Sequence, residues 1–371
     1  MLNSSIFGSD KMLKHLDRIA SWQAGKLPPP VTVEIQLTNA CNHACPGCSF
    51  SYLVFQPGPK DSMPYDVAEH LVSQLAAMGV RAVTISGGGE PLAWGESRVV
   101  KLLRHARSLG MDTALITNGS LLRDFEFLSI CEWVRVSLDA YDGETFQRFH
   151  GRSEREFAKV VANLRIMGRE AKRRKSHNEK CATLGVGFLT QRDSVEANHF
   201  WKMAEFCAGI DGLDYLQFRP LVQSMAVDAT LKAGWESFTK DELRALRHTF
   251  GEAAAMFGRE DFHVLASEGK YEALSQPAFG RKYDRCLGHF LEAVVAADCK
   301  VYHCCHGAGQ EKFCLGDLRE NTFAEIWHSE RAKAVYESFD PRDTCSPACR
   351  LHLQNNVLHD LGQPTTHKNF I

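Results

Sequence analysis

Residues 31–48 have the sequence VTVEIQLTNACNHACPGC, and this stretch decides which folds the chain can adopt. Apolar and polar side chains alternate over residues 31–37, which predicts a β-strand. The loop after this strand carries Cys41, Cys45 and Cys48 in the spacing C-x3-C-x2-C. Three cysteines in one short loop indicate a metal centre, because the Asn, His and Pro residues beside them are not typical of an apolar core.

Strand and helix patterns alternate from this stretch to about residue 220. The predicted strands lie at residues 31–37, 81–86, 112–117, 133–138, 184–190 and 215–220. Helical periodicity is present between them, at residues 65–78, 97–109, 121–128, 154–167 and 194–208. Six such βα units predict an α/β fold in which parallel strands form a partial (β/α)6 barrel. In folds of this kind, ligands bind at the carboxyl ends of the strands.

The character of the chain changes after a helical pattern at residues 240–257, and we expect a domain boundary near residue 260. The expected segments are a helical lead-in at residues 1–30, the barrel at 31–260, a small cysteine-rich α+β domain at 261–360 and a loose polar tail at 361–371. Within the cysteine-rich domain, we expect a β-hairpin at residues 290–302 and one helix at residues 322–339.

Composition and charge exclude several classes of protein. The 371 residues are 44% hydrophobic, and 43 Lys and Arg face 45 Asp and Glu, so no charge excess favours nucleic acid or an anionic membrane. No window approaches about 18 consecutive apolar residues and the first ten residues are polar, so we expect a soluble, cytoplasmic protein. The one dense basic run, at residues 172–175, is expected to be a solvated connector.

The chain has thirteen cysteines, a high number for a protein expected in a reducing compartment. Their odd total and uneven spacing argue against a disulfide framework and favour metal binding or catalysis. Cys131, Cys181 and Cys207 fall within strand or helix patterns, so we expect them to be ordinary core residues.

The C-x3-C-x2-C loop, placed after the first of six βα units, resembles the radical S-adenosylmethionine (SAM) superfamily. The resemblance covers residues 31 to about 220. It implies that Cys41, Cys45 and Cys48 bind a 4Fe–4S cluster whose fourth iron is open to the amino and carboxylate groups of SAM. From the residues alone, a zinc site with His43 as the fourth ligand stays open.

One position departs from the family pattern. The residue before the third cysteine is often aromatic in this family and packs on the adenine of SAM, whereas here it is Gly47. Phe50 and Tyr52 are the alternatives for adenine packing.

Further motifs at the strand ends resemble the SAM pocket of the family. The sequence SGGGEP at residues 86–91 resembles the GGEP motif, whose backbone receives the amino group of SAM. The resemblance also places the end of the fourth strand near the ribose or carboxylate, and the glycine-rich fifth strand near adenine. Asn118 and Arg219 could instead form a turn and a structural ion pair. The expected SAM-binding residues are Gly88, Gly89, Glu90, Asn118, Ser137, Asp139 and Arg219.

Four C-terminal cysteines suit a closed iron–sulfur cluster, and a structural zinc is the alternative. The expected ligands are Cys286, Cys304, Cys345 and Cys349. The segments at residues 298–305 (DCKVYHCC) and 315–327 resemble SPASM and twitch auxiliary domains. Because too few cysteines remain for the full SPASM set, the resemblance implies one auxiliary 4Fe–4S cluster, the twitch form. Cys305 could replace Cys304 as a ligand.

The resemblance implies a radical SAM oxidoreductase. Such an enzyme cleaves SAM to a 5′-deoxyadenosyl radical and abstracts hydrogen from its substrate, here expected to be a small molecule or carbohydrate-like. The auxiliary cluster would accept the remaining electron, which makes the net reaction an oxidation. The expected protein partner is a low-potential electron donor such as flavodoxin or ferredoxin.

Two alternatives stay open. One is a maturase or epimerase of a ribosomally made peptide or protein, in which Cys299 or Cys314 could return a hydrogen atom to the substrate. The other is a non-catalytic iron–sulfur or zinc protein.

Overall fold

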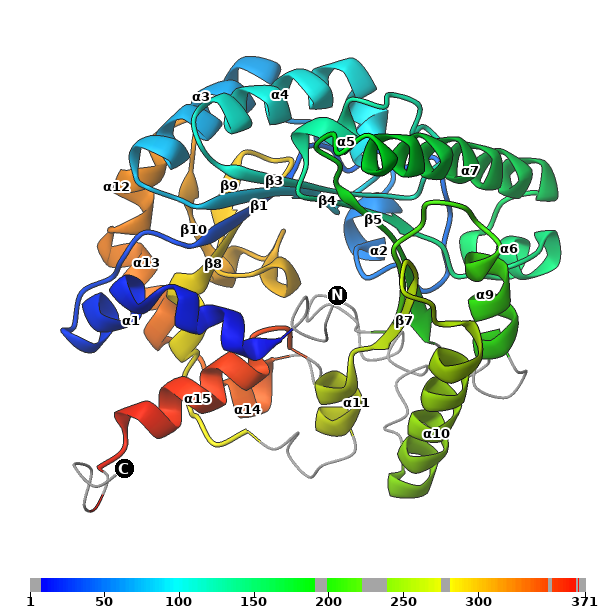
Figure 1. Ribbon diagram of the computed structural model, residues 1–371. Coiled ribbons are helices and arrows are strands. Elements are labelled where there is room, and N and C mark those ends of the chain that lie inside the picture. The colour runs from blue at the N-terminus through cyan, green and yellow to red at the C-terminus, as the bar shows by residue number, and fades with distance from the viewer. Residues whose placement is uncertain are drawn as a thin grey trace.

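The computed structural model describes residues 8–190, 199–221, 239–274, 281–345, 349–364 and 366. Within them, ten strands form one curved sheet in the order β10-β9-β8-β1-β2-β3-β4-β5-β6-β7 (Figure 1). The strands are β1 (Thr32–Gln36), β2 (Ala82–Ser86), β3 (Asp112–Thr117), β4 (Trp133–Ser137), β5 (Thr183–Thr190), β6 (Tyr215–Pro220), β7 (His263–Ala266), β8 (Glu292–Val295), β9 (Lys300–Tyr302) and β10 (Cys314–Asp317).

Neighbouring strands from β1 to β7 are all parallel, which confirms the α/β class and the six predicted strands. The sheet has two parallel strands more than predicted. β7 pairs with β6, and β8 pairs with β1 in the register Thr32↔Glu292. The expected boundary near residue 260 therefore precedes β7, and hydrogen bonding of the sheet continues across it.

Helices cover the outer face of the sheet, with α3, α4, α5 and α7 in one layer along it (Figure 1). The helices are α1 (Leu16–Gln23), α2 (Ser51–Val54), α3 (Tyr65–Ala77), α4 (Glu96–Ser108), α5 (Phe127–Ile130), α6 (Gly143–His150), α7 (Glu154–Ser176), α9 (His199–Ala208), α10 (Lys240–Phe257), α11 (Glu268–Leu274), α12 (Phe323–Trp327), α13 (Glu330–Glu337), α14 (Pro341–Thr344) and α15 (His352–Gly362). Short 3-10 helices are η2 (Ser9–Lys14), η3 (Pro91–Trp94), η6 (Leu287–Leu291), η7 (Cys305–Gly307) and η8 (Glu311–Phe313).

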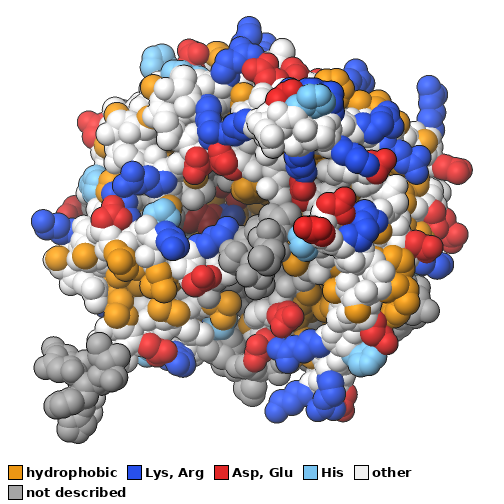
Figure 2. All heavy atoms as spheres, viewed as in Figure 1, with side chains coloured by type: hydrophobic (Ala, Val, Ile, Leu, Met, Phe, Trp, Pro, Cys, Tyr) orange, Lys and Arg blue, Asp and Glu red, His pale blue; other side chains and the backbone are white. Residues whose placement is uncertain are grey.

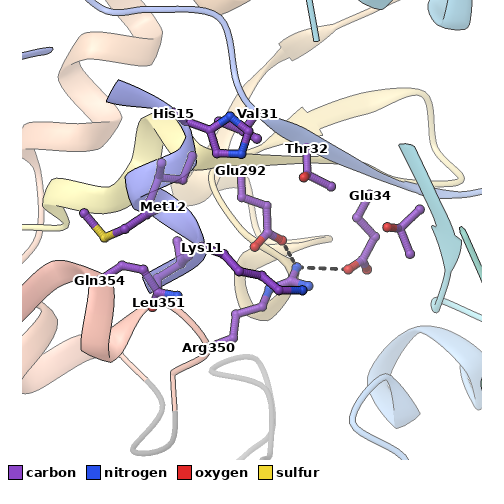
Figure 3. Close-up of a pocket in the computed structure, with 12 residues that line it drawn as sticks. Lys11, Met12, His15, Val31, Thr32, Glu34, Glu292, Arg350, Leu351 and Gln354 are labelled. Atoms are coloured by element: carbon purple, nitrogen blue, oxygen red, sulfur yellow. Dashed lines mark hydrogen bonds and ion pairs between the residues drawn. The ribbon is translucent and has the colours of Figure 1, made fainter. Parts of the chain in front are cut away.

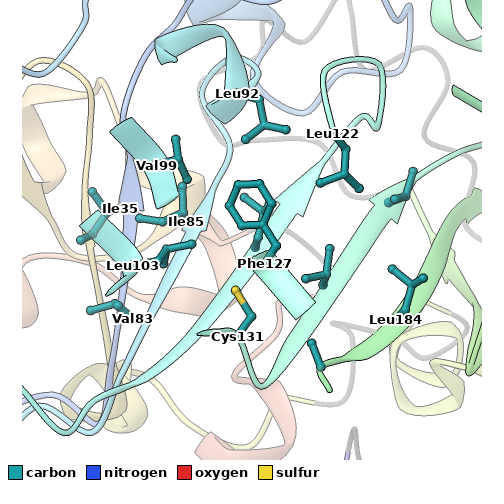
Figure 4. Close-up of a cluster of buried hydrophobic side chains, with 14 of the residues drawn as sticks. Ile35, Val83, Ile85, Leu92, Val99, Leu103, Leu122, Phe127, Cys131 and Leu184 are labelled. Carbon is teal, nitrogen blue, oxygen red and sulfur yellow. The ribbon is translucent and has the colours of Figure 1, made fainter. Parts of the chain in front are cut away.

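The main core lies between the strands and this helical layer (Figure 4). On α3, the buried residues Ala68, Leu71, Val72 and Leu75 repeat at helical spacing and form one apolar face. Burying each leucine side chain contributes roughly 1.5–3 kcal/mol, so this face fixes the helix against the sheet. Cys131 is fully buried among such residues, as predicted for an ordinary core cysteine.

Several helix predictions were wrong in detail. The segment predicted as one helix at residues 322–339 is two helices, α12 and α13, because Ser329 caps a new helix by accepting the Ala332 N–H. Residues 172–175 are not a connector but belong to the end of α7, where Arg173 and Arg174 pair with Glu170. The helix predicted at 121–128 is only the short α5, and α6 was not predicted.

The lead-in and the C-terminal region pack on each other. Met12 and Ile19, from η2 and α1, share a small apolar cluster with Phe290 of η6 and Leu358 of α15. The predicted hairpin is confirmed, because β8 and β9 pair antiparallel with Val295 opposite Val301. Most of the predicted tail at 361–371, and residues 194–198 of a predicted helix, lie outside the described residues.

On the face seen in Figure 2, positive and negative side chains are interspersed around a hollow. Over the described part of the chain, no helix has the length and apolar character needed to cross a membrane.

Candidate functional site

The cysteine loop follows β1 and gathers three partly exposed thiols, Cys41, Cys45 and Cys48. Burial raises the pKa of all three thiols, to about 11 for Cys48. Asp139, and then the thiols of Cys48 and Cys41, raise the pKa of Cys45 further, so its thiol lies near the other two. Without a cation the thiols would stay protonated, and a metal or cluster that stabilises three thiolates suits this loop.

Two buried histidines support this loop. His150, the last residue of α6, accepts the Asp139 backbone N–H at Nε2 over 2.9 Å. Its Nδ1 lies 3.5 Å from the Cys45 sulfur and 3.4 Å from Nδ1 of His43. Burial lowers the pKa of His43 to about 4 and that of His150 to about 3, so both rings are neutral near pH 7.

The sequence also left open a zinc site with His43 as a ligand, and the surroundings of His43 bear on it. Its Nε2 lies 2.7 Å from the Ser120 hydroxyl, and both of its ring nitrogens therefore have protein partners. Ligand atoms of His43, Cys45 and His150 lie within 4.8 Å of one another. A zinc site that includes His43 would have to break these hydrogen bonds.

The glycine-rich turn after β2 is locked onto the cysteine loop. The Gly89 N–H donates to the Thr38 carbonyl over 2.7 Å, and the Glu90 N–H donates to the Ala40 carbonyl over 2.9 Å. A Cβ at position 89 would lie 2.0 Å from the Ala40 oxygen, so only glycine fits there. Gly88 has φ +79°, a conformation that also favours glycine.

Glu90 joins this turn to the end of β3. Its carboxylate is 2% exposed and accepts hydrogen bonds from the Thr117 hydroxyl (2.6 Å) and the Asn118 N–H (2.7 Å). Burial raises the pKa of Glu90, and these hydrogen bonds oppose the rise. The Asn118 side chain donates to Asn42 in the cysteine loop over 2.8 Å. Thr117 and Asn118 thus form a turn that holds the loop.

The end of β4 carries Ser137 and Asp139. Ser137 is half-buried and lies opposite Gly187 of β5. The Asp139 carboxylate accepts the Leu189 N–H over 2.6 Å, and burial raises its pKa to about 7. Both residues therefore lie at the strand ends where the sequence analysis expected them.

A cavity of about 490 Å³ occupies the inside of the barrel. Phe50, two residues after the triad, lines it near the cysteine loop, and Arg219 of β6 lines its wall. On the far side it is lined by Cys305 and Cys349. The cavity thus connects the cysteine loop to the C-terminal cysteines. Tyr52, the other residue expected to pack on adenine, is not among the described residues that line this cavity, and its hydroxyl donates to the Ala308 carbonyl over 2.8 Å.

The four C-terminal cysteines expected as ligands gather in one place. Burial raises the pKa of Cys304, and the thiols of Cys305, Cys345, Cys349 and Cys286 raise it further, so these thiols lie near one another. The Asn355 amide lies 3.8 Å from the Cys286 sulfur.

Cys305 is distinguished from Cys304 by its surroundings. After burial, the groups that act on the Cys305 thiol are Arg350, Glu34 and Glu292, and Cys349 comes only after them. Cys304 is acted on by all three of the other expected ligands, whereas Cys305 lines the central cavity, so Cys304 as the ligand stays a prediction.

The remaining cysteines have structural surroundings. Cys314 is buried with Tyr302 and Phe313, and Cys299 occupies the β8–β9 turn with φ +64°. Neither of them is among the described residues that line the central cavity, so the structure gives no support to the expectation that one returns a hydrogen atom to a substrate there. Cys207 is fully buried and Cys181 is half-buried.

Arg350 connects the C-terminal region to the barrel. It pairs with Glu34 of β1 over 2.9 Å and with Glu292 of β8, as the dashed lines in Figure 3 show. Glu34 and Arg350 line both the central cavity and a second cavity of about 270 Å³ below η2, so this ion pair lies between the two.

Sequence reasoning missed the supporting residues His150, Arg135, Lys270 and Arg350. One signal was present: the parallel strands carry charged or polar residues on alternate positions, such as Glu34 in β1 and Arg135 in β4. Strands buried on both faces are instead nearly all apolar, so this alternation indicates a polar cavity.

Comparison with known families agrees with this geometry. The model of the radical SAM superfamily matches residues 35–196, which include the triad. The model of the SPASM iron–sulfur cluster-binding domain matches residues 286–350, which include the four C-terminal cysteines. These matches imply 4Fe–4S clusters in both regions.

Individual relatives differ in how much of this chain they cover. An S-adenosylmethionine-dependent nucleotide dehydratase of Lacinutrix mariniflava is 34% identical over 143 residues, which is 37% of this chain and 28% of that protein. The chain thus spans less than two thirds of this relative. An AdoMet-dependent heme synthase of Methanosarcina barkeri is 23% identical over 85% of this chain and 86% of its own.

Among solved structures, SuiB of Streptococcus suis bound to the precursor peptide SuiA has a TM-score of 0.64 at 15% identity. The match covers 91% of this chain and 73% of SuiB, and it shows a shared fold.

Proposed function

This chain belongs to the radical SAM superfamily and carries a SPASM-type iron–sulfur domain, and from this premise we propose that it cleaves SAM reductively and abstracts hydrogen from a substrate in the central cavity. The observation that carries the proposal is the cavity itself, which runs from Phe50 beside the triad to Cys349. A substrate held there would lie between two iron–sulfur sites.

In this proposal Cys41, Cys45 and Cys48 hold the cluster that binds SAM. The donor set fits, because three thiolates leave one iron of a 4Fe–4S cluster open. When bound, the cluster supplies the low-potential electron that releases methionine and a 5′-deoxyadenosyl radical from SAM.

The chain's own residues orient SAM and exclude water. The turn with Gly88, Gly89 and Glu90 lies against the cysteine loop and offers its backbone to the amino group of SAM. Ser137 and Asp139 lie toward the ribose or carboxylate. Phe50 packs over Gly87, where a Cβ would lie 2.4 Å from its ring, and in this proposal its ring covers the adenine. Asn118 completes the proposed SAM pocket, whereas Arg219, also expected there from the sequence, lines the central cavity beside Arg135 and Lys270.

Cys286, Cys304, Cys345 and Cys349 would hold the second cluster. Four thiolates suit a closed 4Fe–4S cluster, which can accept the electron left on an oxidised substrate. An external donor, of the flavodoxin or ferredoxin kind, would supply the first electron.

The relatives named above differ in their chemistry: one is a nucleotide dehydratase, one is a heme synthase, and SuiB binds a precursor peptide. The cavity of about 490 Å³ lies within the range typical of small-molecule sites, which supports a small substrate over a long peptide.

The first test is anaerobic reconstitution followed by iron, sulfide and zinc analysis. We expect about eight irons per chain in the wild type and about four in the Cys41/Cys45/Cys48→Ala variant. Only the wild type should form 5′-deoxyadenosine from SAM and dithionite. The matched control is Cys131/Cys207→Ala, which should keep the full iron content because both cysteines lie in the core.

A zinc content of about one per chain that survives the triple substitution would assign the C-terminal cysteines to zinc and remove the electron acceptor. Wild type with full iron and no 5′-deoxyadenosine would contradict the enzymatic function.

Cys305 favours epimerisation as a second candidate function, because its thiol lines the cavity. In D2O, such an enzyme would place one deuterium atom from the thiol on the product carbon and leave a thiyl radical on Cys305. One electron from the external donor and one proton from solvent would restore the thiol, and Cys305→Ser would abolish the incorporation. Product that carries no deuterium and has lost two hydrogens would exclude epimerisation and support oxidation.

A further inference from the structure

Three cationic side chains gather on the wall of the central cavity: Arg135 of β4, Arg219 of β6 and Lys270 of α11. Burial, and then the nearby Arg219, lower the pKa of Arg135 to about 9. Burial, and then Arg219, Arg350 and Arg135, lower the pKa of Lys270 to about 8. The three charges are therefore close enough to repel one another.

Within the described residues these cations have carboxylates nearby but no direct ion pair. Glu34 acts on Arg135 and Glu292 on Lys270, but both of these carboxylates are held by Arg350, and Arg135 also lies over the Trp133 ring at 5.6 Å. In the same described part of the chain, the buried Nε atoms of Arg135 and Arg219 have no hydrogen-bond partner. Asp139 acts on Arg219 from nearby, but its own carboxylate accepts the Leu189 N–H.

Arg350 is a fourth cation on this cavity, and it differs from the other three in having ion-pair partners. It lines the same cavity and is held by two carboxylates, Glu34 and Glu292. Removing a cation from water without pairing it is costly. Arg350 is paired, whereas the three half-buried cations beside it are not, which favours an external anion between them.

The backbone provides room for the two arginines to converge. A Cβ at Gly187 of β5 would lie 3.0 Å from Arg135 Cδ and 3.0 Å from Arg219 Nη2. Both side chains therefore pass over Gly187, and their guanidinium groups lie near each other on the face of β5.

We propose that Arg135, Arg219 and Lys270 bind an oxyanionic group of the substrate, a phosphate or a carboxylate of a small molecule. Two guanidinium forks can each donate two parallel hydrogen bonds to such a group, and the ammonium adds a point charge. The assignment rests on the proposed function, because it takes the cavity as the substrate site. Binding of the anion can nevertheless be measured without turnover.

The experiment is calorimetric titration of the anaerobically reconstituted protein with SAM already bound, so that the carboxylate of SAM occupies its own site. The probes are inorganic pyrophosphate and citrate, in separate titrations at constant ionic strength. We expect saturable binding of at least one probe, weakened about tenfold or more by Arg135→Gln and by Lys270→Gln. The matched control is Lys101→Gln, an exposed lysine on α4, which should leave the affinity unchanged.

The two probes distinguish the source of the anion: binding of pyrophosphate alone assigns a phosphate, and binding of citrate alone assigns a carboxylate. Arg135→Lys, which keeps the charge, should restore part of the affinity and shows that the fold is intact. The inference is overturned if neither probe binds, if both glutamine variants bind as the wild type does, or if the probe displaces SAM.

The same samples keep the inference separate from the proposed function. A protein that binds the probe through Arg135 and Lys270 but forms no 5′-deoxyadenosine would contradict the proposed function alone. A protein that forms 5′-deoxyadenosine but binds neither probe would contradict the inference alone.

Discussion

One ring nitrogen of His150 accepts a backbone hydrogen bond, and this determines which nitrogen of the ring carries the proton. Because Nε2 accepts the Asp139 N–H and the ring is neutral, the proton of the imidazole is on Nδ1. That N–H points toward the Cys45 sulfur at 3.5 Å and toward His43 at 3.4 Å. Hydrogen bonds to cluster sulfurs stabilise the reduced form, so this histidine is placed to raise the potential of a cluster on the triad.

We therefore expect His150→Phe, which keeps a ring stacked on Phe146, to lower that potential. A hydrogen bond of about 1 kcal/mol corresponds to about 40 mV for one electron. The measurement is an EPR-monitored redox titration, with thermal melting on the same samples to check the fold. His177→Gln at the exposed end of α7 is the control, and a potential equal to that of the wild type would refute this role.

Among individual site residues, the sequence predicted those that lie in contiguous motifs. The triad and the glycine-rich turn were recognisable because their spacing is local. His150, Lys270 and Arg350 were not, since each acquires its partners only when distant strands and helices come together. The sequence likewise could not show that Cys305 lines the central cavity while Cys304, next to it in the chain, lies among the other C-terminal thiols.

Among the elements, the turn between β2 and η3 is hydrogen-bonded both to the cysteine loop and to the end of β3, and so it connects these two parts of the proposed SAM site. Gly89→Ala would put a methyl group 2.0 Å from the Ala40 carbonyl and push the cysteine loop away. We expect a loss of roughly 1–3 kcal/mol in the free energy of unfolding, together with reduced iron content after reconstitution.

The control for this substitution is Gly251→Ala in α10, where no atom lies within 4 Å of the added carbon. This variant should be neutral or gain roughly 0.5–1 kcal/mol, because alanine is the better helix former. Chemical denaturation compares the two, and equal stabilities would show that the tight approach at Gly89 does not constrain the loop.

The six predicted barrel strands agree with the structure to within a residue or two, because their apolar patterns are local, whereas the short strands β7 and β10 were not predicted. Short helices were harder, as α6 and the break between α12 and α13 show. Both depend on capping: Asp142 accepts the Thr145 N–H at the start of α6, and Ser329 starts α13. Such local hydrogen bonds compete with longer helical periodicity and are easily hidden by it.

For the whole molecule, the sequence predicted the α/β class but not how the C-terminal region joins the barrel. Its hairpin is not a separate unit, because β8 pairs with the edge of β1 opposite β2 and so extends the barrel sheet. The Arg350 pairs with Glu34 and Glu292 reinforce this junction. Pairing between strands so far apart in sequence leaves no local pattern, which is why the sequence did not reveal it.

The pairing of Thr32 with Glu292 has a consequence for how the protein is made. During synthesis, β1 emerges from the ribosome early, whereas its second neighbour emerges only near the end of translation. Until then β1 is an exposed strand edge, able to pair with other chains. Contacts this distant in sequence also slow folding. The strand that precedes the cysteine loop is therefore among the last parts of the sheet to be completed, and a nascent chain would benefit from chaperone protection of that edge.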